Sequence, residues 1–124
     1  MDQNMNDRQA LGKWGENFAA DYLMARGYTI MGRNVRTSYG EIDVIARQED
    51  TLVFVEVKTR TSRAFGYPEE AITAQKREHL IQASQAYLQS HPQLEYDWRI
   101  DVIAIQRKSE ERLPQLKHFE NAIT

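Results

Sequence analysis

Residues 40–60 read GEIDVIARQEDTLVFVEVKTR, and this stretch decides the fold. Two strongly apolar segments, 41–47 and 52–58, each have the length and composition of a β-strand. Between them lie only the four polar residues Gln48-Glu49-Asp50-Thr51, a common length for a hairpin link. The stretch therefore predicts an antiparallel β-hairpin.

The register of this hairpin brings charged side chains together. If the link is symmetric, counting outward from its centre places Asp43 opposite Glu56 and Glu41 opposite Lys58. Side chains alternate between the two faces of a strand, so these four share one face. The other face is expected to be entirely apolar, which fixes the register: Ile42, Val44, Ala46, Val53, Val55 and Val57.

The rest of the chain predicts helices and strands around this hairpin. An apolar stripe with helical spacing indicates a first helix over 8–26 that stops at Gly27. Pro68, followed by two acids, predicts the start of a second helix that runs to about Ser90. We expect further strands at Tyr28–Val35 and Trp98–Ile105, with Gln115–Phe119 as a possible short edge strand. This order, αβββαβ, is typical of an α/β domain with helices packed on one sheet.

Length and composition fit one domain over residues 1–124, with 1–7 and the extreme C-terminus expected to be flexible. The chain has 124 residues, of which 41% are apolar, and no cysteine, so disulfides and thiolate metal sites are excluded. Met1 to Ala10 is polar, unlike a secretory signal, and no apolar stretch approaches the roughly 20 residues that span a bilayer. We therefore expect a cytoplasmic protein without a membrane partner. The net charge of −2 argues against coating of nucleic acid by bulk charge, but not against a local basic groove.

The two opposed carboxylates, Asp43 and Glu56, are the main candidates for a functional site. Facing Cβ atoms lie about 5 Å apart, and two like charges at that distance destabilise a sheet unless something compensates them. One solution is a raised pKa and a shared proton, and the other is a divalent cation between Asp43 and Glu56. Carboxylate oxygens suit Mg²⁺ or Mn²⁺, and the Lys58 ammonium could orient water or stabilise phosphoryl charge. A plain Glu41–Lys58 ion pair is the competing explanation for the outer two residues.

The spacing of Asp43 and Glu56-Val57-Lys58 resembles the PD-(D/E)xK nuclease superfamily, which includes restriction endonucleases and Holliday-junction resolvases. The leading proline of that motif is replaced by Ile42. The chain is still more similar to the small bacterial YraN-like proteins over roughly residues 10–123. That similarity rests on Gly15-Glu16, Ala19-Ala20, Gly40-Glu41-Ile42-Asp43, Phe54-Val55-Glu56-Val57-Lys58, Phe65-Gly66, the helix beginning near Pro68, Asp101-Val102-Ile103 and Glu120-Asn121-Ala122.

The resemblance implies a restriction-endonuclease-like three-layer core, with a mixed central sheet between helices, and nucleic-acid binding. By analogy with junction resolvases, Glu16 would complete the metal site, although it could equally be a solvent-facing helix residue. Gln75 lies where some relatives place a glutamine that faces the site. Asp101 has the chemistry of a ligand, but nothing opposes it in a readable hairpin, so we expect a structural role.

Basic side chains near the motif could contact phosphates, although each one singly is more often just solvated. They are Arg33, Arg36, Arg60, Arg63, Lys76 and Arg77. The preferred hypothesis is a Mg²⁺- or Mn²⁺-dependent endonuclease that hydrolyses phosphodiester bonds in DNA, with branched or damaged DNA as candidate substrates. The alternative is a non-catalytic nucleic-acid-binding module on a nuclease fold. The sequence leaves the oligomeric state open; a homodimer would help so small a chain to span a branched duplex.

Overall fold

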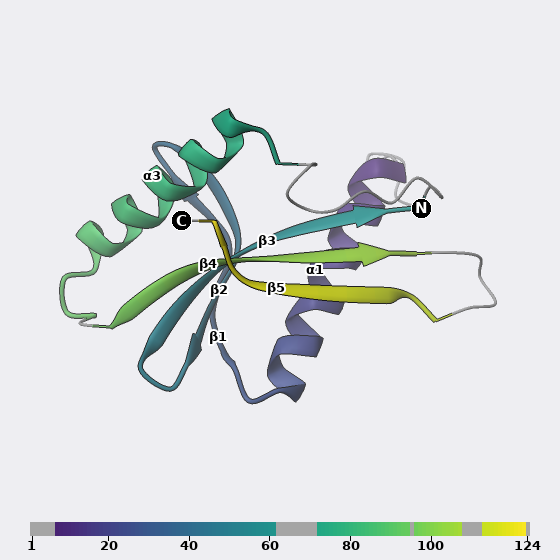
Figure 1. Cartoon of the computed structure of the whole chain (residues 1–124), viewed down its shortest axis with the longest axis horizontal. Coiled ribbons are helices and arrows are strands. Elements are labelled where there is room, and N and C mark those ends of the chain that lie inside the picture. Colours follow the sequence, from purple (N-terminus) through teal and green to yellow (C-terminus); the bar gives the residue numbers. More distant parts are fainter. Residues whose placement is uncertain (1–6, 62–71, 95, 108–112, 124) are drawn as a thin grey trace, which may run out of the picture.

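A five-stranded sheet with one helix on each side forms the part of the chain that the computed structural model describes, residues 7–61, 72–94, 96–107 and 113–123 (Figure 1). The elements, in chain order, are α1 (Asp7–Ala25), β1 (Thr29–Thr37), β2 (Gly40–Gln48), β3 (Thr51–Arg60), α3 (Ala74–Ser90), β4 (Asp97–Gln106) and β5 (Gln115–Ile123). The expected α/β class and the order αβββαβ are confirmed. The final strand runs to Ile123, further than the short edge strand predicted at Gln115–Phe119.

The sheet is mixed, as expected. Its strands lie in the order β1-β2-β3-β4-β5, so neighbours in space are neighbours in sequence. The pair β3–β4 is parallel, whereas the other pairs are antiparallel. A parallel pair needs a crossover connection, and α3 lies within the segment that makes it. No helix in the described part of the chain is long and apolar enough to cross a membrane.

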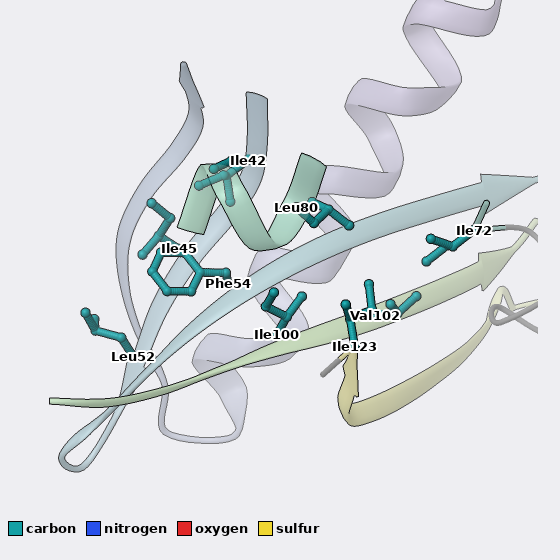
Figure 2. Close-up of a cluster of buried hydrophobic side chains, with 10 residues drawn as sticks. Ile42, Ile45, Leu52, Phe54, Ile72, Leu80, Ile100, Val102 and Ile123 are labelled. Carbon is teal, nitrogen blue, oxygen red and sulfur yellow. The ribbon is translucent and has the colours of Figure 1, made fainter. Parts of the chain in front are cut away.

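Two separate apolar clusters make the structure three layers deep. One cluster joins the sheet to α3 through Leu80 and Ala83, and Figure 2 shows its residues gathered between that helix and the strands. The other joins the opposite sheet face to α1 through Ala19 and Leu23. Strands with a helix on each face carry apolar residues at successive positions, which explains the apolar run Val53–Val55 in β3.

The predicted hairpin register is confirmed over its paired part. Arg47 pairs with Leu52 and Ile45 pairs with Phe54, as the symmetric link requires. The turn is tighter than the four-residue link, because Gln48 and Thr51 also pair. Glu49 takes a positive φ of 52° in this turn, a backbone conformation typical of two-residue hairpin turns.

The predicted apolar face of the hairpin is wrong at Ile42. Val44, Ala46, Val53 and Val55 belong to the α1 cluster as expected, but Ile42 belongs to the α3 cluster. Positions two apart in a regular strand share a face. The β2 strand therefore changes its orientation between Ile42 and Val44, at Asp43.

The ends of the helices follow local signals. α1 ends just before Gly27, as predicted, and Gly27 has a φ of 90° that favours glycine. α3 begins at Ala74, not at Pro68, because Thr73 is in an extended conformation and its side chain accepts a hydrogen bond from the backbone N–H of Lys76. This N-cap satisfies a donor that the first helical turn leaves free. Pro68 itself lies outside the described residues.

Candidate functional site

The candidate site lies where β2 separates from β3. Described backbone pairs between these strands extend from Gln48–Thr51 to Val44–Val55 and no further. At the next position, Asp43 Oδ2 accepts a hydrogen bond from the backbone N–H of Val57 at 2.8 Å. A side-chain carboxylate thus binds a backbone donor at the point where the strand pairing ends. This holds Asp43 at the point where the two strands part.

The environment of Asp43 favours its protonated form. Burial raises the pKa of Asp43 to about 7, and the negative charges of Glu56 and then Glu16 act in the same direction. The hydrogen bond from Val57 and the positive charge of Lys76 oppose that shift. Any additional positive charge close to Asp43 would stabilise its ionised form.

Glu56 lies on β3 with its side chain only 4% exposed. Its Oε2 atom is 3.2 Å from Lys58 Nζ and 3.7 Å from Lys76 Nζ. Its Oε1 atom is buried and has no hydrogen-bond partner among the described residues. Buried polar atoms are almost always satisfied. An unpartnered carboxylate oxygen beside Asp43 therefore fits a site for a cation.

The residues that could hold a metal are Asp43 and Glu56. Both supply hard oxygen atoms, which Mg²⁺ and Mn²⁺ prefer. Within the described segments, no group of three or more His, Cys, Asp or Glu side chains could hold a metal ion. The protein would thus supply two carboxylates. Mg²⁺ commonly keeps several waters and binds through one or two carboxylates plus phosphate oxygens, so this donor set suits it.

Glu16 approaches the same site from α1. Its charge contributes to the raised pKa of Asp43, so the two carboxylates are close enough to interact. Its Oε1 atom accepts a hydrogen bond from Asn34 Nδ2 at 2.8 Å. Glu16 is therefore an electrostatic neighbour of Asp43, attached to β1 rather than grouped with Asp43 and Glu56 in a three-carboxylate cluster.

The competing Glu41–Lys58 pair is absent from the ion pairs of the described residues. Lys58 contacts Glu56, two positions earlier on its own strand, while Glu41 lies 3.8 Å from Arg36 on β1. The prediction failed because it extended the hairpin register past Val44, where β2 turns away. The Lys58 ammonium is consequently directed to the acidic site.

The predicted basic residues are spread over several elements. Lys76, in the first turn of α3, reaches Glu56, and Gln75 beside it is exposed. Arg60 is exposed at the end of β3. The other four take separate places. Arg33 donates to Asn17 Oδ1 at 2.7 Å, Arg36 contacts Glu41, Arg77 follows Lys76 in α3, and Arg63 lies outside the described residues. Of this set, the structure brings Lys76 into contact with the carboxylate site.

Asp101 is fully buried on β4, and its hydrogen-bond partners lie outside the Asp43 site. Its oxygens lie 2.7 Å from His118 Nε2, 3.0 Å from Arg99 Nε and 2.8 Å from the backbone nitrogen of Asn121. Burial alone would raise the pKa of Asp101, but the hydrogen bonds of these three residues outweigh it and hold the pKa below its usual value. The arrangement supports the expected structural role, because it fixes β4 to β5.

Sequence reasoning missed Asn34 and His118. Asparagine is depleted in β-strands, so its occurrence inside a predicted strand was the sequence feature that marked Asn34 as unusual. His118 carried no signal, because its contact with Asp101 depends on the β4–β5 register, including the irregularity between Ile100 and Val102.

The fold and the site together define an α/β domain with a pair of carboxylates, flanked by lysines, where the strands β2 and β3 part. The chain belongs to the Uncharacterised protein family UPF0102, whose model matches residues 15–105. It is 44% identical to the UPF0102 protein of Syntrophotalea carbinolica, over 93% of this chain and 92% of the relative. It is 45% identical to that of Syntrophomonas wolfei and 47% identical to that of Alkaliphilus oremlandii, each over 90% of this chain and 96% of the relative. This confirms the family predicted from the sequence.

Proposed function

We propose that this protein is a metal-dependent nuclease that hydrolyses phosphodiester bonds in DNA. The observation that carries the proposal is the buried, unpartnered Oε1 atom of Glu56, next to a second carboxylate whose pKa is raised to about 7. The spacing of Asp43 and Glu56-Val57-Lys58, which resembles the PD-(D/E)xK motif, supports it. A DNA substrate would place the protein in the cytoplasm.

In this proposal Asp43 and Glu56 hold Mg²⁺ or Mn²⁺. A bound divalent cation would polarise the phosphoryl group and lower the pKa of water. Asp43 is fixed by its bond to Val57, so it requires little reorganisation to act as a ligand.

Lys58 is the proposed catalytic cation. Its ammonium now contacts Glu56 Oε2, and its side chain is about one-third exposed, so it can reach both the carboxylate site and a phosphate from solvent. There it would stabilise the charge that develops on the phosphoryl oxygens and orient the attacking water. Lys76, at the start of α3, would bind a neighbouring phosphate, where the amino end of the helix also favours negative charge.

A second candidate is a DNA-binding module without turnover. Lys58 and Lys76 both contact Glu56 without a metal, so the site already has partial charge compensation. Such a site could bind DNA phosphates through its lysines and never require a cation.

The decisive experiment is a cleavage assay on labelled duplex, single-stranded and four-way-junction DNA, and on RNA, with Mg²⁺, Mn²⁺ or EDTA. We expect metal-dependent cleavage of at least one DNA substrate, lost in Asp43→Asn. The matched control is Asp50→Asn, which makes the same chemical change at the turn of the same hairpin. DNA binding without cleavage of any substrate would reject the nuclease and support the binding module.

A further inference from the structure

Asn34 adopts an uncommon backbone conformation opposite the site. Its φ is 49°, in the left-handed region that side chains other than glycine seldom occupy. Its neighbours Arg33 and Val35 pair with Val44 and Ile42, so Asn34 lies opposite Asp43 in the β1–β2 register. The uncommon conformation on β1 therefore lies opposite the position at which the side chains of β2 change from one apolar cluster to the other. Strain of this kind is concentrated at functional sites in proteins, and asparagine tolerates it better than most residues.

The conformation gives the Asn34 side chain a defined partner. Its Nδ2 atom donates a hydrogen bond to Glu16 Oε1 on α1 at 2.8 Å. Immediately beside it, Arg33 donates to Asn17 Oδ1 at 2.7 Å, so consecutive residues of β1 bind consecutive residues of α1. Of these two bonds, the one from Asn34 engages a carboxylate whose charge acts on Asp43.

We propose that Asn34 is a positioning residue: it holds the Glu16 carboxylate on the α1 side of the site and thereby strengthens uptake of a divalent cation by Asp43 and Glu56. This role rests on the proposed function. A glutamate side chain has several rotatable bonds and loses entropy when it is held in one orientation. A hydrogen bond already present in the metal-free protein meets part of that cost before the cation arrives. Residues that orient groups around a metal typically change its affinity by 10- to 100-fold.

The test measures Mn²⁺ affinity by isothermal titration calorimetry. The principal variant is Asn34→Gly, which retains the positive φ but removes the amide, so its backbone remains unstrained. Asn17→Ala is the matched control, because it breaks the neighbouring bond between α1 and β1 without touching Glu16. Glu16→Gln and the double variant Asn34→Gly/Glu16→Gln complete a double-mutant cycle.

We expect Asn34→Gly to weaken Mn²⁺ binding by about 10-fold, and Asn17→Ala to change it less than twofold. The double variant should bind Mn²⁺ no more weakly than Glu16→Gln alone, because Asn34 acts through Glu16. In the metal-free protein, the NMR signals of the Asn34 side-chain amide should shift on Glu16→Gln and stay in place in Asn17→Ala.

Three results would overturn this role for Asn34 while leaving the metal site intact. They are wild-type Mn²⁺ affinity in Asn34→Gly, equal losses in Asn34→Gly and Asn17→Ala, and additive losses in the double variant. Failure of the proposed function has a different signature. The wild-type protein would then show no Mn²⁺ binding that depends on Asp43, and the positioning role would fall with it, even if the amide signals report the hydrogen bond.

Discussion

The carboxylate of Asp43 and the backbone N–H of Val57 are joined by a hydrogen bond of 2.8 Å across the point where β2 and β3 part. The same side chain is thus a proposed metal ligand and a structural link between two strands. Its charge state is consequently linked to the stability of the sheet, because burial and neighbouring acids raise its pKa to about 7.

The first prediction concerns pH. The folded-state pKa of Asp43, about 7, exceeds its ordinary value of 3.8, so the folded protein binds more protons than the unfolded chain between these two values. Asp43 should therefore make the metal-free protein less stable as pH rises from about 4 to about 7, by up to about 1.4 kcal/mol per pH unit. Asp43→Asn, which can still accept the Val57 hydrogen bond, should lack this loss. Urea unfolding in EDTA across this range measures it, and parallel curves for the two proteins would contradict it.

The second prediction separates metal binding from turnover at Lys58. Lys58→Ala should keep its affinity for Mn²⁺, or gain slightly, because a cation that competes for Glu56 has been removed. Turnover should fall by roughly 100-fold or more, as when one preorganised stabiliser of the transition state is deleted. The control is Lys117→Ala, which removes an exposed lysine from β5. Cleavage by Lys58→Ala at the wild-type rate would disprove the assigned role.

The third prediction concerns DNA affinity. Replacing Arg60 and Lys76 together by Ala should weaken binding to all DNA sequences alike, because contacts to phosphate carry no base information. The slope of log affinity against log salt should decrease by about 2, one unit for each lost phosphate contact. Fluorescence anisotropy at several salt concentrations gives both quantities. An unchanged slope would mean that the DNA-binding surface lies elsewhere on the molecule.

The fourth prediction concerns the contact of α1 with β3. A methyl group at Gly15 would overlap the side chain of Thr59, whereas one at Gly12 would meet no atom. Gly15→Ala should therefore destabilise the fold by about 1–3 kcal/mol, despite its better helix propensity. Gly12→Ala, the matched control on the same helix, should stabilise it by roughly 0.5–1 kcal/mol. Thermal melting distinguishes them, and stabilisation by Gly15→Ala would show that Thr59 can move away.

The parts of the fold that were predictable from sequence depend on local patterns. Arg47–Leu52 and Ile45–Phe54 pair as predicted, because alternation of side chains and a short symmetric turn leave few other registers. The start of α3 at Ala74 was not predicted, because Pro68-Glu69-Glu70 gave a start signal as strong as the Thr73 cap.

The site was predictable in its residue types but not in its full arrangement. Asp43 and Glu56 were singled out because carboxylates are conspicuous in two apolar strands, but the described β2–β3 pairing ends at Val44–Val55, before the predicted Asp43–Glu56 pair. The change of face at Asp43 and the reach of Lys76 from α3 depend on tertiary packing. The hydrogen bond of Asn34 to Glu16 likewise joins β1 to α1 and follows from no local rule.

The parallel pairing of β3 with β4 has a consequence for synthesis of the protein. Asp43, Glu56 and Lys58 lie within one meander of neighbouring strands, so contacts of short sequence separation can assemble them early. The other edge of β3 stays unpaired until residues 97–106 have been synthesised, because this edge pairs with β4, for example Val55 with Asp101. On the ribosome, the apolar edge of β3 therefore emerges well before its partner strand, as an unpaired edge prone to aggregation. Translation that stalls before β4 should yield insoluble chains that already contain every proposed catalytic residue.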